Sequence, residues 1–152
     1  MVNWTANGYR LPTETEWEFA AKGGTLAQPT PYTYSGSNTI DNVAWYSSNS
    51  GTTTYTVGQK SANELGIYDM SGNVWEWCWD WYDNSSGAYP FGGTTDPKGP
   101  STSQTYRLLR GGSFGVSEFY CRVGIRSVYG YFPSARVNYN GVVDVGFRCV
   151  QK

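Results

Sequence analysis

The stretch NELGIYDMSGNVWEW, residues 63–77, runs on into CWDWY and carries the most informative pattern in the sequence. Tryptophan alternates with other residues at Trp75, Trp77, Trp79 and Trp81. A period of two is typical of a β-strand and places the four indoles on one face. Because packing in the core is the commoner use of Trp, we expect this face to belong to the core. A stacking platform for a sugar is the alternative.

Upstream of this stretch, GYRLPTETEWEFAAKGG (residues 8–24) predicts a helix. Thr13 and Glu16 have the spacing of a capping box, and acidic residues in the first turn suit the helix dipole. The pair Gly23-Gly24 predicts the end of the helix.

The remaining chain alternates short strand-like runs with loops. Strand-like runs occupy residues 52–57, 106–109, 120–126 and 146–150, and residues 122–126 alternate as in a half-buried strand. Residues 28–64 and 83–105 are rich in Gly, Ser, Thr, Asn and Pro, which indicates long ordered loops. The fold class is therefore α+β with little helix, and we expect residues 1–152 to form a single domain.

Composition excludes several functions. The 152 residues carry a net charge of −1 and include no histidine, which removes Ser-His-Asp and Cys-His catalysis and histidine-based zinc sites. Near-neutral charge argues against a nucleic-acid binder. No run approaches the roughly 20 apolar residues of a membrane span, and the N-terminus does not resemble a signal peptide. For Cys78, Cys121 and Cys149, one disulfide with a free thiol and three thiols both fit.

The small net charge hides an asymmetry. Residues 1–100 contain 4 basic and 10 acidic side chains, whereas residues 101–152 contain 7 basic and 2 acidic ones. All but the last of the basic residues after 101 are Arg, which pairs well in buried positions. We expect these arginines to hold the acidic half within one fold; a nucleic-acid surface is the alternative.

Four segments together resemble a known family: GYRLPTETEWEFAAKGG (8–24), NELGIYDMSGNVWEW (63–77), RLLRGGSF (107–114) and VGFRCV (145–150). Their combination and order are similar to the formylglycine-generating-enzyme, or sulfatase-modifying-factor, family. The resemblance implies a variant of the C-type lectin fold. It covers nearly the whole chain, which resembles the C-terminal two-thirds of a family domain, so the usual N-terminal part is expected to be lacking.

The resemblance also implies a test for catalysis. Catalytic members hold copper(I) with two cysteines spaced five apart shortly after RGGS, and these positions fall on Val116 and Cys121. Val116 cannot ligate copper, and a soft ion needs its thiolate pair. Related sulfoxide synthases bind iron through histidines, which this chain lacks. We therefore expect no enzyme activity, no copper and no iron; a residual oxidoreductase is the alternative.

Family members hold calcium on the loop that matches residues 69–76. By position, the resemblance implies the ligands Asp69, the carbonyls of Gly72 and Val74, and the carboxylate of Glu76. Mixed carboxylate and carbonyl oxygens suit a structural calcium. In the alternative, Asp69 and Glu76 cap backbone amides or pair with Arg.

Residues 114–145 have the composition of a binding surface, with Tyr and Phe among Gly, Ser, Val and Asn. A subgroup of the family resembles the variable proteins of diversity-generating retroelements, found in phages and in bacteria including treponemes. Mutation at template adenines there cannot convert AAC codons to Lys, Gln, Glu, Met or Trp. Only Glu118 in this segment belongs to that set. An ordinary non-catalytic family member with a Tyr-rich loop is the alternative.

On this interpretation, the chain is a non-catalytic binding module that recognises a protein or other macromolecule, for example on a host or neighbouring cell. The expected location is the cell surface or the extracellular space, and the oligomeric state is open. Calcium-dependent carbohydrate binding is a further alternative, although the Glu-Pro-Asn sugar motif is absent. Arg122, Arg126 and Arg136 would be scaffold. The expected ligand-binding residues are Gly115, Val116, Ser117, Phe119, Tyr120, Ile125, Ser127, Val128, Tyr129, Gly130, Tyr131, Val137, Asn138 and Tyr139.

Overall fold

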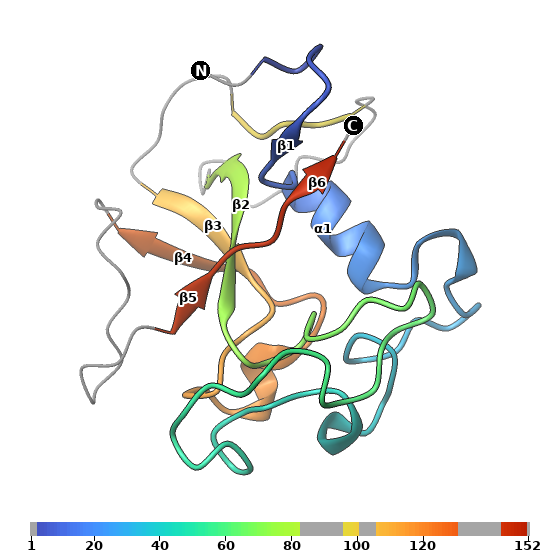
Figure 1. Cartoon of the computed structure of the whole chain (residues 1–152), viewed down its shortest axis with the longest axis vertical. Coiled ribbons are helices and arrows are strands. Elements are labelled where there is room, and N and C mark those ends of the chain that lie inside the picture. The colour runs from blue at the N-terminus through green and yellow to red at the C-terminus, as the bar shows by residue number, and fades with distance from the viewer. Residues whose placement is uncertain (1–2, 83–95, 101–105, 131–143, 152) are drawn as a thin grey trace.

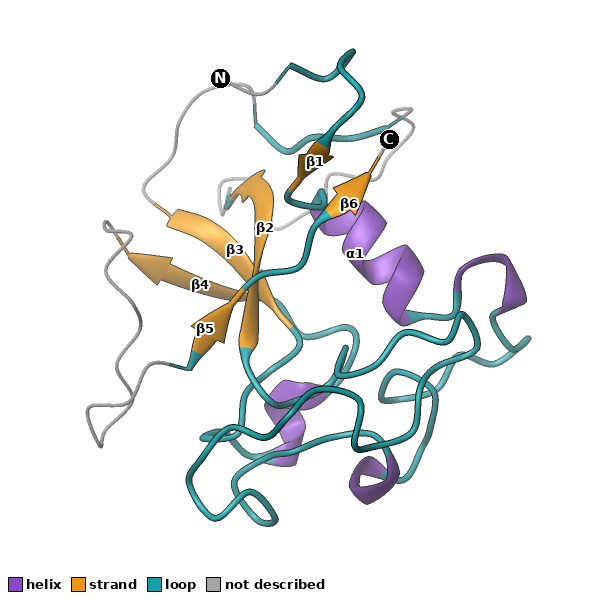
Figure 2. Ribbon diagram, viewed as in Figure 1, coloured by secondary structure: helices purple, strands orange, loops and turns teal. Residues whose placement is uncertain are grey.

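The structure is a computed structural model that describes residues 3–82, 96–100, 106–130 and 144–151 (Figure 1). Much of this part of the chain is loop (Figure 2). None of its helices is both long and apolar enough to cross a membrane. In chain order the elements are β1 (Tyr9–Arg10), α1 (Glu14–Ala21), η1 (Gly24–Leu26), η2 (Ile40–Asn42), β2 (Trp75–Trp81), β3 (Tyr106–Arg110), η3 (Glu118–Cys121), β4 (Ser127–Gly130), β5 (Val145–Gly146) and β6 (Val150–Gln151), where η denotes a 3-10 helix.

Helix α1 confirms the predicted capping box. The Thr13 side chain accepts a hydrogen bond from the Glu16 N–H, and the Glu16 carboxylate accepts one from the Thr13 N–H. The helix is followed by Gly23, whose φ of 91° lies in the left-handed region that glycine adopts without strain. Both helix ends are therefore encoded locally.

Two sheets organise the fold. The larger has the strand order β4-β3-β2-β5, in which β5 runs parallel to β2 and the other pairs are antiparallel. The smaller pairs β1 with β6, so an early and a late strand of the chain lie side by side at one end of the molecule (Figure 1). The strand predicted over residues 106–109 is confirmed as β3, and that over residues 146–150 is divided between β5 and β6.

The strand predicted over residues 120–126 is wrong. Tyr120 and Cys121 belong to η3, and a turn follows in which the Ile125 N–H bonds the Arg122 carbonyl. The buried Arg110 guanidinium donates to the carbonyls of Val123 and Ile125, at 3.0 and 2.9 Å. An arginine side chain thus takes acceptors that a neighbouring strand would need.

Residues 52–57 also form no strand. The side-chain amide of Asn73 occupies both backbone groups of Tyr55, since its oxygen accepts from the Tyr55 N–H and its nitrogen donates to the Tyr55 carbonyl. One amide side chain replaces a strand partner here, which keeps this part of the chain as ordered loop.

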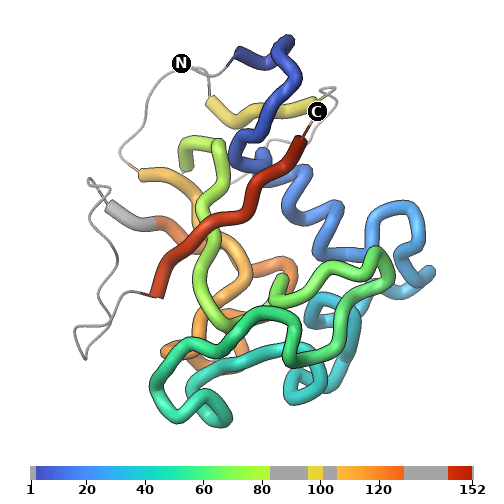
Figure 3. Tube along the Cα trace, viewed as in Figure 1, coloured from blue at the N-terminus to red at the C-terminus, as the bar shows by residue number. Residues whose placement is uncertain are grey.

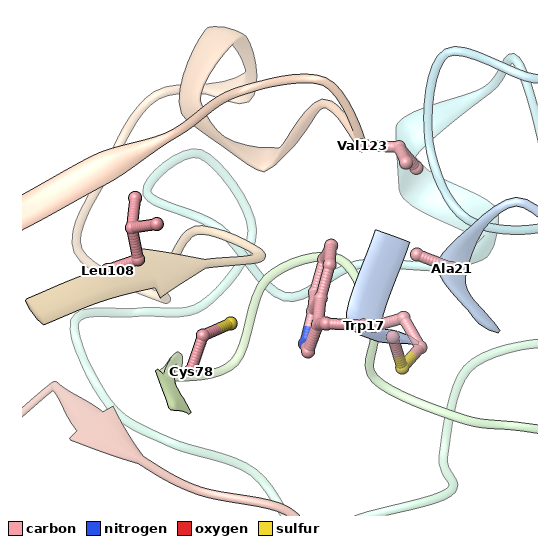
Figure 4. Close-up of a cluster of buried hydrophobic side chains, with 6 residues drawn as sticks. Trp17, Ala21, Cys78, Leu108 and Val123 are labelled. Atoms are coloured by element: carbon pink, nitrogen blue, oxygen red, sulfur yellow. The ribbon is translucent and has the colours of Figure 1, made fainter. Parts of the chain in front are cut away.

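Two apolar clusters form the core. The first joins α1 to the sheet, and Figure 4 shows Trp17 at its centre with Cys78 of β2 pointing toward it. The second lies among the loops, where residues 112–121 meet residues 34–46 (Figure 3). The members of the second cluster are Tyr34, Ile40, Val43, Ala44, Tyr46 and Cys121, with Val116 packed against them.

The tryptophan row on β2 confirms the strand alternation and corrects its orientation. Trp75 is buried, but the other three tryptophans of the row are only half-buried. The face that is buried throughout carries Glu76, Cys78 and Asp80. The expectation that all four indoles lie in the core is therefore wrong, because polar side chains with defined partners occupy the inner face.

Candidate functional site

The loop after β3 forms the base of the candidate binding surface. Gly112 has a φ of 77°, and a Cβ built on it would lie 2.7 Å from the Cys121 Sγ. Only glycine permits this close approach, which seats Cys121 directly on the RGGS loop. The Ser71 hydroxyl also donates to the Cys121 carbonyl at 2.9 Å. The C-terminal end of η3 is thus fixed from two sides.

The two positions that match the copper ligands do meet in space. Val116 packs against the second apolar cluster, which contains Cys121. The Cys121 thiol is fully buried, and burial raises its pKa to about 12. A single buried thiol, with valine at the position of the second ligand, does not fit a copper(I) site, which needs a pair of thiolate sulfurs.

The chain between RGGS and β5 is closed by a buried hydrogen bond that the sequence analysis did not identify. The Ser113 hydroxyl donates to Asp144 Oδ2 at 2.9 Å, and the Asp144 carbonyl accepts from the Trp75 N–H. Ser113 and Asp144 are both buried. Ser113 immediately precedes the segment of unusual composition (residues 114–145), and Asp144 is its last residue but one; this placement was the signal available in the sequence. They join the start and the end of that segment.

Part of the predicted ligand-binding set lies on the surface around η3. Gly115, Ser117, Phe119 and Tyr120 are exposed, and Val116 is half-buried. The rings of Phe119 and Tyr120 meet edge to face, with their centroids 5.4 Å apart. Side chains of this kind supply large contact area with few rotatable bonds.

A second part of the set lies on or near β4, at an edge of the sheet. Ser127 is half-buried and paired with Leu109, while Tyr129 pairs with Arg107. Val128 packs against the first apolar cluster. Ile125 is half-buried in the turn before β4. Of the predicted ligand-binding residues, Val128 thus contacts the core.

The rest of the predicted set lies outside the described residues. These members are Tyr131, Val137, Asn138 and Tyr139, and the same holds for Arg136 of the expected scaffold. Gly130 is described by its place in β4, opposite Tyr106.

Four charged side chains lock the 122–130 segment to α1, and we call them the ionic clamp: Glu14, Glu18, Arg110 and Arg126. Arg126 makes a two-pronged contact with the buried Glu14 carboxylate, at 2.7 and 2.8 Å. Arg110 is fully buried and bonds Glu18, with Glu14 at 3.6 Å. The expectation that arginines hold the acidic half is confirmed for Arg110 and Arg126.

The ionic clamp continues to Asp80 on the inner face of β2. The Asp80 carboxylate accepts a hydrogen bond from the Glu14 N–H at 2.7 Å. Burial raises the pKa of Asp80 to about 6, a shift that the bond from the Glu14 backbone opposes and the charge of Glu14 reinforces. The Asp80 carboxyl therefore changes its charge close to neutral pH.

Arg122, expected to belong to the scaffold, is placed differently. Its side chain is exposed and lies over the Phe119 ring, with its guanidinium carbon 4.9 Å from the ring centroid. Across the described ranges, no carboxylate comes within ion-pair distance of it. Arg122 is thus a surface residue rather than part of the clamp.

In the loop predicted to bind calcium, Glu76 has other partners. Its carboxylate bonds the Arg148 guanidinium through both oxygens, each at 2.6 Å, and also accepts from the Trp17 indole N–H at 2.6 Å. Arg148 further donates to the carbonyls of Tyr68 and Asp69. Both oxygens of the Glu76 carboxylate are thus engaged by a guanidinium, as the arginine-pairing alternative expects.

Asp69, Gly72 and Val74 are the other members of the predicted calcium ligand set. Asp69 Oδ2 accepts from the Gly58 N–H, whereas its buried Oδ1 has no hydrogen-bond partner in the described chain. Gly72 is buried against Trp45, and Val74 is half-buried. No group of three or more His, Cys, Asp or Glu suited to a metal occurs among the described residues. The capping and arginine-pairing alternative describes this loop, and the calcium ligand set stays a prediction.

Comparison with known proteins identifies the family. The model of the sulfatase-modifying factor enzyme 1-like domain matches residues 2–152. The fold places the chain in the class of C-type-lectin-like domains that resemble formylglycine-generating enzymes. The chain belongs to the sulfatase-modifying factor enzyme 1-like family.

Individual relatives differ in their described roles. The solved structure of Treponema denticola variable protein 1 is 41% identical, with a TM-score of 0.80 over 97% of this chain and 49% of that one. The formylglycine-generating enzyme of Thermomonospora curvata is 37% identical over 93% of this chain and 49% of its own length. Chaperone protein LppX of Paenibacillus barcinonensis is 45% identical over 74% of this chain and 41% of its own. The chain spans about half the length of the curated relatives it matches.

Proposed function

We propose that this chain is a non-catalytic binding module that recognises a protein or other macromolecule through the surface formed by η3, β4 and the segment that joins them. The observation that carries the proposal is the contrast around Cys121. Its thiol is buried with a pKa near 12, Val116 stands where the second copper ligand would be, and the residues around both are exposed. The similarity to a treponemal variable protein supports the same function.

The surface suits recognition because its base and its contact residues are separate. Arg110 donates a hydrogen bond to the backbone of this segment, and Arg126 bonds the buried Glu14 of α1. The Ser113–Asp144 hydrogen bond joins residues near the start and the end of residues 114–145. Contact residues such as Ser117 and Tyr120 are exposed, so their replacement leaves the buried bonds intact. A ligand on a host or neighbouring cell, and a location at the cell surface or outside the cell, are part of this proposal.

Sequencing the coding region from many isolates tests the proposal. We expect amino-acid changes to concentrate at the predicted ligand-binding positions within residues 115–120 and 127–139, while Glu14, Arg110 and Arg126 stay constant. Changes no denser in codons 114–145 than elsewhere, with no template copy nearby, would contradict the variable-surface interpretation.

A residual oxidoreductase is the second candidate, favoured by the similarity to formylglycine-generating enzymes. It requires a soft metal at Cys121. We expect copper(I) titration of the native chain to show no site that Cys121→Ser removes, because Val116 supplies no second sulfur ligand. Tight copper binding that depends on Cys121, with oxidation of a cysteine-containing sulfatase peptide, would establish this candidate instead.

Carbohydrate binding is favoured by the half-buried Trp77, Trp79 and Trp81. A glycan array in the presence and absence of a chelator separates it from protein recognition. Glycan binding that Trp79→Ala abolishes would support a sugar site on the tryptophan face of the sheet.

A further inference from the structure

Three exposed side chains beside η3 form a small projecting group, which we call the η3 knob: Phe119, Tyr120 and Arg122. Phe119 and Tyr120 are 47% and 46% exposed, although aromatic side chains of this size usually lose more of their surface on folding. Arg122 stacks on Phe119, and Phe119 meets Tyr120 edge to face. The three side chains therefore hold one another in a defined arrangement at the surface.

The backbone beneath the η3 knob is fixed at successive residues. The Tyr120 N–H donates to the Ser117 carbonyl, and the Cys121 carbonyl accepts from the Ser71 hydroxyl. The Arg122 carbonyl accepts from the Ile125 N–H, and the next N–H, of Val123, donates to the Thr33 carbonyl. A partner that docks here would find its contact residues already ordered, which lowers the entropic cost of binding.

Its partners distinguish Arg122 from three other arginines of residues 101–152. Arg110, Arg126 and Arg148 each bond a carboxylate. Arg122 stands in contact with a ring, and no described carboxylate pairs with it. Its guanidinium keeps edge N–H donors that suit a carboxylate from outside the chain.

The nearby acids face another group. Asp41 and Glu118 lie close to Tyr46, where burial and then the charges of these two carboxylates raise the pKa of the Tyr46 hydroxyl. Glu118 forms no ion pair with Arg122 within the described residues. The positive charge of the η3 knob is thus not cancelled by an ion pair at its own surface.

This inference rests on the proposed binding function and names the partner's chemistry. We propose that the η3 knob recognises an acidic segment of a protein, in which Arg122 bonds a carboxylate and Phe119 and Tyr120 cover the apolar atoms beside it. Arg and aromatic residues together, with one unmatched charge, are typical of the residues that dominate protein interfaces.

Three capped pentapeptides, with the cores Glu-Tyr-Glu, Gln-Tyr-Gln and Lys-Tyr-Lys between glycines, test this preference on the full chain by NMR of the backbone amides. We expect the acidic peptide to shift the amides of residues 119–123 and to bind about tenfold more tightly than the neutral one, and the basic peptide to bind most weakly. Equal affinities, or no shift at residues 119–123 from any of the three, would overturn the inference.

Matched variants identify the residue responsible. Arg122→Gln is expected to remove the preference for the acidic peptide without changing the fold, since the side chain is exposed. Lys98→Gln removes an exposed cation that stacks on Trp4 elsewhere and should leave the preference unchanged. A preference that survives Arg122→Gln would overturn the inference. Binding at residues 115–120 without charge preference would leave the proposed function standing, whereas isolates with no concentrated variation there would count against that function alone.

Discussion

Arg122 of the η3 knob and Arg126 of the ionic clamp are neighbours in the sequence, yet the two arginines serve opposite purposes. Arg126 is bonded through two nitrogens to the buried Glu14, and Arg122, four residues earlier, lies exposed on Phe119. The difference comes from α1, whose Glu14 and Glu18 form ion pairs with Arg110 and Arg126. An arginine in this segment therefore becomes scaffold only where an acid from the first half of the chain reaches it.

Breaking the clamp should have the largest effect on stability. Glu14→Gln leaves the guanidinium of Arg126 without its carboxylate and removes a charge beside the buried Arg110. We expect a loss of about 3–5 kcal/mol in the free energy of unfolding, measured by urea denaturation. Lys22→Gln breaks the exposed Lys22–Glu18 pair and serves as the control, with an expected loss below about 0.5 kcal/mol. Similar losses for both variants would contradict the clamp.

A substitution at Gly112, which contacts Cys121 at the end of η3, should have the next largest effect on stability. Gly112→Ala introduces a Cβ 2.7 Å from the Cys121 Sγ at a φ of 77°, so we expect a loss of about 2–4 kcal/mol in urea denaturation. Gly124→Ala is the matched control, because a Cβ there meets no atom within 4 Å. A neutral Gly112→Ala variant would show that Cys121 is not held in the way described.

The charge of Asp80 offers a smaller effect with a pH dependence. Its pKa of about 6 in the folded chain exceeds the ordinary value of 3.8 that applies to the unfolded chain. The folded state therefore binds the Asp80 proton more tightly than the unfolded state does. The contribution of Asp80 to the free energy of unfolding therefore rises as the pH falls from 7 through 6 toward 4. Asp80→Asn should stabilise the chain by about 1 kcal/mol at pH 7.5 and by much less at pH 4.5. A gain that is the same at both pH values would contradict this assignment.

The exposed side chains of the η3 knob should tolerate substitution. Tyr120→Ser removes an aromatic ring that is about half exposed, and we expect it to alter the free energy of unfolding by less than about 0.5 kcal/mol. Thermal unfolding of this variant beside the unmodified chain measures the effect. A loss as large as that of Gly112→Ala would show that the η3 knob is part of the core.

Local signals in the sequence predicted the elements that local interactions determine. The capping box of Thr13 and Glu16 and the turn at Gly23 define α1, and the alternation of tryptophans defines β2. The family resemblance predicted the fold. It also predicted that Val116 and Cys121 belong to one site, and both lie at the second apolar cluster.

Long-range partners explain what the sequence did not predict. The tryptophan row turns partly outward because Glu76, Cys78 and Asp80 find Arg148, the first apolar cluster and the Glu14 N–H on the inner side. Residues 120–126 leave the strand conformation because Arg110 takes two of their carbonyls. None of these partners is near in sequence, so no local pattern could indicate them.

If a rigid clamp carries a replaceable surface, two display libraries should differ in the fraction of their members that fold. One library randomises Ser117, Phe119, Tyr120 and Arg122; the other randomises Glu14, Arg110, Gly112 and Arg126. Sorting by protease resistance measures the folded fraction of each. We expect most members of the first library to fold and very few of the second. Equal folded fractions in the two libraries would show that the clamp does not carry the surface.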